Sequence, residues 1–176
     1  MKFKKLTFSI LILIILLIVL QVPFKTALVF YERNTDNLEA FLPINKGDTF
    51  QVIFKHSIHL TDVVEKYKVR DDLAIEQYEI VYEEFGIGMP SNALEGEKFE
   101  YKNGKYHVSS LDNIFQTLKI RNGKTVSENR LVWGTEKTEK GHMVQFNKYF
   151  IPGEWYTILV ERISLWDYLK GVKISE

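Results

Sequence analysis

The sequence contains no cysteine among its 176 residues. This absence excludes disulfide bonds, thiol catalysis and zinc sites built on cysteine, although it does not decide the cellular compartment. A Gly-x-Ser-x-Gly nucleophile elbow is also missing, and the adjacent His56 and Ser57 point to opposite faces of a predicted strand. A serine hydrolase is therefore not expected. No internal repeat, low-complexity segment or linker divides the chain.

Acidic residues are absent from the first 25 positions, which hold four lysines: Lys2, Lys4, Lys5 and Lys25. The remainder therefore has 19 basic and 23 acidic residues, a net charge of −4. This mild acidity argues against a nucleic-acid partner, which would require a basic face. Hydrophobic residues make up 45% of the chain and charged residues 26%, a balance typical of a globular domain.

The segment Leu6–Phe24 is an uncharged apolar run of 19 residues. As a helix it would measure about 28 Å, close to the thickness of a bilayer's hydrocarbon core. The lysines before it predict a cytoplasmic N-terminus and an external remainder. A cleaved signal peptide is the alternative, but no small-x-small cleavage site follows. We therefore predict a signal-anchor transmembrane segment at residues 1–25 and an extracytoplasmic β domain at residues 26–176, held at the cell membrane through Leu6–Phe24.

The rest of the chain is typical of a β protein. Aromatic residues make up 14%, and two Asn-Gly dipeptides, at 103–104 and 122–123, predict two-residue hairpins. Ser164 is a candidate cap for a short helix over residues 165–170, and residues 111–115 are a candidate helical turn. Further strands are expected at 26–31, 38–42, 130–133, 142–146 and 155–162, with a polar turn at 135–141. The expected fold is all-β, an antiparallel sandwich or barrel-like domain of about ten short strands.

The stretch Phe50–Pro90 places polar side chains on an apolar face. Alternation puts Phe50, Val52, Phe54 and His56 on one side, and a four-residue turn would set His56 opposite Glu65. A one-residue slip would bury lysines, which favours this register. The next strand would then bring Glu76 and Tyr78 beside Tyr67 and Glu65. The sequence thus predicts a polar cluster of His56, Glu65, Tyr78 and Glu76.

Two interpretations of this cluster stay open. It is either a buried pair that fixes the strand register, or a small site that binds a solute or metal or transfers a proton. The four histidines, His56, His59, His107 and His142, lack zinc-like spacing, and no metal or other cofactor is expected. An enzyme is the less favoured class.

The predicted third strand ends in the sequence FGIGMP, Phe85–Pro90. Its glycines permit close backbone approach, and because no helix follows, it is not expected to cradle a phosphate. Together with His56–Glu65 it resembles the paired motif of a bacterial family of small membrane-anchored proteins, whose domain has no known function. The resemblance extends from Gly47 to Trp133. The matching residues are His56, Ser57, Thr61, Val63, Glu65, Phe85, Gly86, Gly88 and Pro90.

Two positions depart from the family pattern: Asp62 stands where proline is usual, and Ile87 where alanine is usual. Members of the family are often encoded beside the TAXI type of tripartite ATP-independent periplasmic (TRAP) transporter. The resemblance therefore implies an accessory or binding module for solute uptake, with the transporter's membrane subunits as partners. An envelope-associated enzyme or structural protein that uses a buried His56–Glu65 pair is the alternative.

Overall fold

In the computed structural model of the chain, the structure describes residues 2–135 and 141–176, the first three of them by backbone alone. Two helices longer than one turn and a series of short strands make up this part of the chain. In chain order the elements are α1 (Lys2–Gln21), β1 (Pro23–Glu32), β2 (Leu38–Pro43), β3 (Thr49–Lys55), β4 (Asp62–Val69), β5 (Ile75–Tyr82), β6 (Lys98–Lys102), β7 (Lys105–Phe115), β8 (Leu118–Arg121), β9 (Arg130–Trp133), β10 (His142–Gln145), the 3₁₀ turn η1 (Phe146–Lys148), β11 (Trp155–Ser164), α2 (Leu165–Lys170) and β12 (Val172–Lys173).

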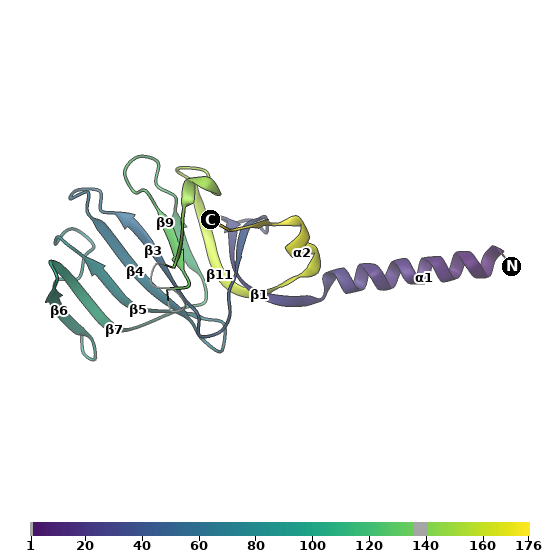
Figure 1. Cartoon of the computed structure of the whole chain (residues 1–176), viewed down its shortest axis with the longest axis horizontal. Helices are drawn as coiled ribbons and strands as arrows, with labels where there is room; N and C mark the ends of the chain where they lie inside the picture. The colour runs from purple at the N-terminus through teal and green to yellow at the C-terminus, as the bar shows by residue number, and fades with distance from the viewer. Residues whose placement is uncertain (1, 136–140) are drawn as a thin grey trace.

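The strands form two sheets that pack as a sandwich (Figure 1). The five-stranded sheet has the order β12-β2-β1-β11-β8, and the seven-stranded sheet has the order β10-β9-β3-β4-β5-β7-β6. Neighbours are antiparallel except β12 and β2, which are parallel. Within the described residues neither sheet closes on itself, so the sandwich and not the barrel-like alternative is the architecture.

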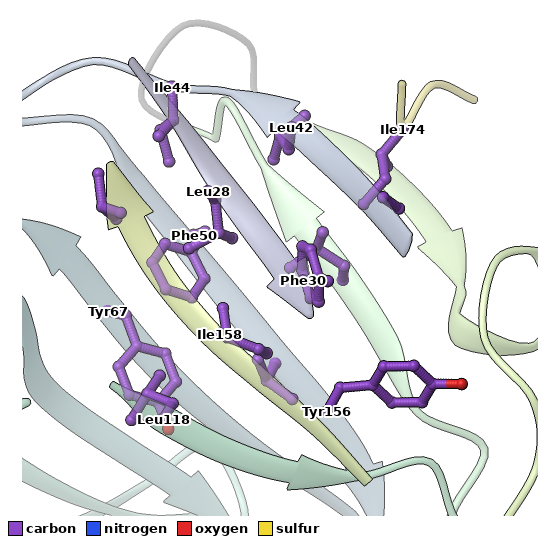
Figure 2. Close-up of a cluster of buried hydrophobic side chains, with 14 of the residues drawn as sticks. Leu28, Phe30, Leu42, Ile44, Phe50, Tyr67, Leu118, Tyr156, Ile158 and Ile174 are labelled. Atoms are coloured by element: carbon purple, nitrogen blue, oxygen red, sulfur yellow. The ribbon is translucent and has the colours of Figure 1, made fainter. Parts of the chain in front are cut away.

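Apolar side chains from the two sheets fill the space between them (Figure 2). Phe30 of β1 packs on Phe150 with ring centroids 4.8 Å apart, and Phe50 of β3 stacks on Tyr67 of β4 at 5.1 Å. The outer part of the seven-stranded sheet packs instead on the segment between β5 and β6, in a second apolar cluster of Val63, Ile80, Tyr82, Val108 and Leu111 with Met89. The chain therefore has a central core and a smaller one at the end opposite α1 (Figure 1). A third cluster, Ala27, Val29, Phe41 and Ile163, packs with Tyr168 of α2.

Local patterns predicted most strands correctly. The expected strands at 26–31, 38–42, 130–133, 142–146 and 155–162 correspond to β1, β2, β9, β10 and β11. The segment 111–115 is not a helical turn, because it continues β7 and pairs with β5. The polar turn predicted at 135–141 lies largely outside the described residues.

One of the two predicted Asn-Gly hairpins forms. Asn103 and Gly104 both have positive φ, 54° and 78°, and join β6 to β7 as expected. The prediction at Asn122-Gly123 is wrong, because β8 ends at Arg121 and pairs with β11. Asn122 is buried there, and its side-chain amide donates to Asn147 Oδ1 and to the Phe150 carbonyl, both at 2.9 Å. Its polar side chain thus ties two loops together instead of making a hairpin.

The apolar N-terminal run is helical over only part of the predicted 19 residues. α1 ends at Gln21, and Pro23 and Phe24 already belong to β1. The helical part of the run, Leu6–Gln21, is 16 residues and measures about 24 Å, against a hydrocarbon core of about 30 Å. In the part of the chain that the structure describes, no helix combines the length and apolarity needed to cross a membrane. The predicted transmembrane helix is therefore not supported.

The second predicted helix, α2, is confirmed together with its cap. The Ser164 side chain accepts from the Asp167 backbone N–H at 3.1 Å, and the Asp167 carboxylate accepts in return from the Ser164 backbone N–H at 3.2 Å. This reciprocal capping box satisfies donors that a helix N-terminus leaves open. It begins α2 directly at the end of β11.

Candidate functional site

A pocket of about 450 Å³ opens beside the smaller apolar core. Its floor comes from the inward face of β4, β5 and β7, and its rim comes from the segment between β5 and β6. Glu65, Gln77 and Asn113 place polar groups on the floor, between apolar walls from Ile80 and Leu111. The rim consists of Gly88, Pro90, Asn92, Leu94 and Glu97. Apolar walls with a few converging polar groups are typical of small-molecule sites. The lining includes no lysine, arginine or histidine.

Glu65 is the central acidic group of this pocket. Its Oε2 accepts a hydrogen bond from the Tyr67 hydroxyl at 2.8 Å, two residues along the same face of β4. Burial raises the pKa of Glu65 above its ordinary value, and the hydrogen bond from Tyr67 opposes this rise only in part. Burial, reinforced by the neighbouring carboxylate, also raises the pKa of the Tyr67 phenol. Tyr67 therefore stays a hydrogen-bond donor, and Glu65 is poised to exchange a proton or to pair with a ligand group.

Two side-chain amides stand beside this carboxylate. Asn113 Nδ2 donates to Gln77 Oε1 at 3.1 Å, and the register pairs Gln77 with Tyr67 on one side and with Asn113 on the other. Relative to β4, Tyr78 is an extra residue of β5 between Gln77 and Glu79, a β-bulge. Relative to β7, the extra residues are 110–112 of β7. The bulge puts Gln77 on the pocket floor and leaves one amide N–H₂ and one amide oxygen of the pair for other partners.

The pocket rim is held by contact between the two halves of the sequence motif. The His56 ring packs against Gly86 so closely that a Cβ there would lie 2.7 Å from His56 Cε1. Nδ1 of His56 accepts long hydrogen bonds from the backbone N–H groups of Ile58 and His59, at 3.3 and 3.5 Å. The ring proton therefore lies on Nε2, which donates to the Ile87 carbonyl at 3.4 Å. His56 thus joins the loop after β3 to the glycine-rich segment.

Aromatic contacts fasten the same segment further along. The Tyr82 hydroxyl donates to the Pro90 carbonyl, and Phe85 packs on Tyr106 with ring centroids 4.2 Å apart. Phe99 of β6 completes this group, 6.2 Å from Phe85 and 5.7 Å from Tyr106. Six of the motif residues therefore form two sets: His56, Phe85 and Gly86 hold the rim, whereas Glu65, Gly88 and Pro90 line the pocket.

The remaining motif residues, Ser57, Thr61 and Val63, lie in the loop after β3 or directly after it. Thr61 accepts from the His56 backbone N–H at 2.9 Å through its carbonyl, and Val63 is fully buried in the smaller core. Ser57 is exposed at the loop tip. Asp62, which replaces the usual proline, forms an ion pair with Arg130 of β9.

The predicted pairing of His56 with Glu65 is wrong. β3 and β4 pair with Val52 opposite Glu65 and Lys55 opposite Asp62, so the connecting loop spans residues 56–61. Glu65 therefore lies four residues, or about 13 Å, along the strand from the position of His56. The shift is an even number of residues, so the predicted faces are right although the register is not. The hypothesis of an enzyme that uses a paired His56 and Glu65 therefore has no geometric support.

The other two members of the predicted cluster also lie elsewhere. Ile80, and not Tyr78, stands opposite Glu65, because the bulge at Tyr78 shifts the pairing. Glu76 pairs with Lys68 and bonds to Arg70 Nη1 at 3.4 Å, close to the turn that joins β4 and β5. Of the four predicted residues, Glu65 alone lines the pocket.

A second carboxylate–histidine contact, not predicted from the sequence, lies on the opposite face of the sheet. Glu79 accepts from Lys66 Nζ at 2.7 Å and contacts His107 Nδ1 at 2.8 Å. Burial pushes the pKa of Glu79 upwards, but the hydrogen bonds from His107 and Lys66 outweigh it and hold the pKa below its ordinary value. This network fits a set of ion pairs that joins the three strands β4, β5 and β7.

Sequence reasoning missed Tyr67, Gln77 and Asn113 as members of the site. One local signal could have identified Tyr67: it follows Glu65 by two residues, so both side chains lie on the same face of the strand. Gln77 and Asn113 depend on a bulge and a distant strand pairing, which no local pattern indicates. Among the described residues, no group of three or more histidine, aspartate or glutamate side chains is placed to hold a metal ion.

Comparison with known proteins gives one match. A family model described as "Domain of unknown function (DUF1850)" matches residues 50–139, which is just over half of the chain and runs from the second residue of β3 to beyond β9. No curated protein and no solved structure matches the chain. The matched segment contains both motif halves, the His56–Gly86 contact and every residue that lines the Glu65 pocket.

Proposed function

The chain belongs to the DUF1850 family, and from this starting point we propose that it is a membrane-attached binding module that holds a small polar solute in the Glu65 pocket. In this proposal the module is an accessory of a TRAP-type solute transporter. The observation that carries it is the pocket itself. A desolvated carboxylate and a pair of amides converge there between apolar walls, under a rim that the family motif holds in place.

The solute role rests on what the pocket offers chemically. Glu65 accepts hydrogen bonds or an opposite charge, and the Gln77–Asn113 pair supplies one donor and one acceptor to a ligand. Ile80 and Leu111 cover apolar parts of a solute. A site of this kind selects polar solutes by hydrogen bonding, because a ligand that lacks the matching groups leaves the half-buried Glu65 and the buried Gln77 without a partner for their polar atoms.

A thermal-shift screen of the full chain in detergent, with amines, amides, polyols and carboxylates, tests the solute role. At a concentration of 100 times its Kd, a bound solute stabilises the fold by about 2.7 kcal/mol, which is easily measured. A solute of the pocket should raise the melting temperature of the wild type and of Glu95→Gln, an exposed control near the rim. It should not raise that of Glu65→Gln. A screen without any response, or equal responses in all three proteins, counts against the pocket.

Membrane attachment is supported by the surface of α1. Its apolar side chains are exposed on every side, from Leu6 at 58% to Val19 at 50%, and the helix projects from the sandwich (Figure 1). A helix that is hydrophobic all round needs an apolar environment, and the described domain leaves most of α1 uncovered. Full-length chain should therefore float with lipid vesicles on a density gradient, and a chain with Ile12→Lys and Leu16→Lys should not. The extracytoplasmic side stays a prediction, which protease accessibility in intact cells tests.

The transporter link rests on the family resemblance and requires its own test. Affinity purification of the tagged chain from mildly solubilised membranes should recover the membrane subunits of a TRAP-type transporter. Recovery should persist in Glu65→Gln if the pocket binds the solute and not the transporter. Deletion of the chain without effect on uptake of any TRAP substrate would contradict the accessory role.

A further inference from the structure

A second apolar surface lies where the five-stranded sheet meets α1. Four side chains there are largely exposed: Val22 at 51%, Phe24 at 48%, Trp166 at 48% and Leu169 at 69%. The first two occupy the junction between α1 and β1, and the last two lie on α2, which contacts both α1 and β1. In Figure 1, α2 lies between the sandwich and the end of α1. The four residues are called the α2 patch below.

The orientation of α2 is fixed by packing on its other side. Tyr168 packs on Phe41 with ring centroids 5.2 Å apart, and it meets Phe24 edge-on at 5.7 Å. Gly171 lies so close to the sheet that an added Cβ would be 3.1 Å from the Phe41 ring. The capping box fixes the start of the helix. Because Trp166 and Leu169 are three residues apart, they share the face that points away from this contact.

We infer that the α2 patch is a membrane-docking surface, which lies on the lipid interface beside the entry point of α1. This inference rests on the proposed membrane attachment of α1 and extends it from the helix to the folded domain. The patch continues the apolar surface of α1 through Val22 and Phe24, so a bilayer that receives the helix reaches the patch as well. Tryptophan is the residue type that membrane interfaces favour, because its ring is apolar and its N–H is polar.

Charge around the patch agrees with a lipid partner. Lys170 is exposed directly after Leu169, and the half-buried Lys25 follows Phe24. Lysines in such positions reach lipid phosphates with their ammonium groups while their alkyl stems lie along apolar surface. The acidic residue of α2, Asp167, is engaged in the capping box and faces Ser164. Asp36 lines a small pocket with Asp167 and Lys170, so the patch presents apolar side chains with Lys25 and Lys170 at its edges and one acidic group beside Lys170.

Docking would give the domain a fixed orientation. With α2 on the bilayer, the outer part of the seven-stranded sheet, with β6 and β7, lies at the end away from the lipid (Figure 1). The Glu65 pocket is built on that part of the sheet, beneath the segment between β5 and β6. The docked α2 patch thus holds the pocket clear of the membrane surface.

The absence of cysteine permits a direct test in the full chain. Leu169→Cys carries an environment-sensitive NBD label in the α2 patch. Ile151→Cys is a matched control, because Ile151 is also exposed, at 67%. It precedes the start of β11, whereas α2 follows Ser164 at the other end of that strand, about 30 Å away. Both proteins are reconstituted in vesicles of phosphatidylcholine with one-fifth phosphatidylglycerol, with or without doxyl-labelled lipid as a quencher.

The Leu169→Cys label should shift its emission to the blue and be quenched by doxyl lipid, whereas the Ile151→Cys label should show neither effect. Adding Trp166→Glu should reverse both effects at position 169 while the protein still floats with the vesicles. If both labels respond alike in vesicle-bound protein, the docking surface is refuted and membrane attachment by α1 stands. Failure of the wild-type chain to float refutes the attachment and the docking surface together.

Discussion

Replacement of Gly86 by alanine tests the link between the two halves of the motif. The added Cβ would lie 2.7 Å from His56 Cε1 and 2.8 Å from Nε2, whereas carbon atoms in contact normally lie about 3.5–4.0 Å apart. Gly86 does not have the positive φ that penalises a side chain by itself, so the cost is steric. The His56 ring has little room to retreat, because it is buried and stacked on His59 with ring centroids 5.1 Å apart.

The expected magnitude follows from two opposing effects. Overpacking of a tight site costs about 1–3 kcal/mol, while glycine-to-alanine replacement restricts the unfolded chain and returns about 0.4–1 kcal/mol. Gly86→Ala should therefore lower the free energy of unfolding by about 1–2 kcal/mol. The measurement is urea denaturation of the full chain in detergent, followed by tryptophan fluorescence.

A double-mutant cycle with His56→Ala shows whether the loss comes from this contact. In the His56→Ala background the nearest ring atom is His59 Nε2, at 3.2 Å, on an exposed side chain that can shift, so Gly86→Ala should be close to neutral there. The coupling energy should be at least about 1 kcal/mol, within the range for residues in contact. Equal costs of Gly86→Ala in both backgrounds would refute the proposed contact.

Three other predictions follow from the site and the core. Burial raises the pKa of Glu65, so the unfolding free energy should fall as pH rises from 4.5 through the raised pKa, and Glu65→Gln should remove this fall in a urea series across pH. The pKa of Glu79 is lowered, so the stability that its carboxylate contributes is present above pH 4.5 and is lost as the pH falls through the lowered pKa. Glu79→Gln should remove this loss of unfolding free energy at acid pH and leave the effect of Glu65 intact. Ile174 is 2% exposed between the two sheets, and Ile174→Ala should cost about 2–4 kcal/mol by urea denaturation, whereas Ile151→Ala at an exposed site should cost less than about 0.5 kcal/mol.

The sequence predicted which side of each strand is buried better than it predicted which residues meet. Alternation placed Val52 and Glu65 on the same face, and the structure pairs them directly. The predicted register was wrong by four residues, because a shift by an even number keeps every side chain on its face and leaves the hydrophobic pattern unchanged. The length of the loop after β3, residues 56–61, decides the register, and alternation does not determine that length.

Long-range contacts explain the other differences. The local sequence does not show that position 86 requires glycine and not another small residue. The requirement comes from the close approach of His56, which belongs to a different loop. Likewise, Asn113 reaches Gln77 across 36 residues of chain through a register shift between β5 and β7. Local signals, such as Asn103-Gly104 and the Ser164 cap, were sufficient because their geometry is set within a few residues.

A calorimetric titration tests the central claim most directly. The solute with the largest response in the thermal-shift screen is titrated into the full chain, into Glu65→Gln and Asn113→Ala, and into the control Glu95→Gln. If the Glu65 pocket is the binding site, both pocket variants should bind at least tenfold more weakly, a loss of about 1.4 kcal/mol, and the control should bind like the wild type. Unchanged affinity in Glu65→Gln and Asn113→Ala would contradict the claim that this pocket holds the solute.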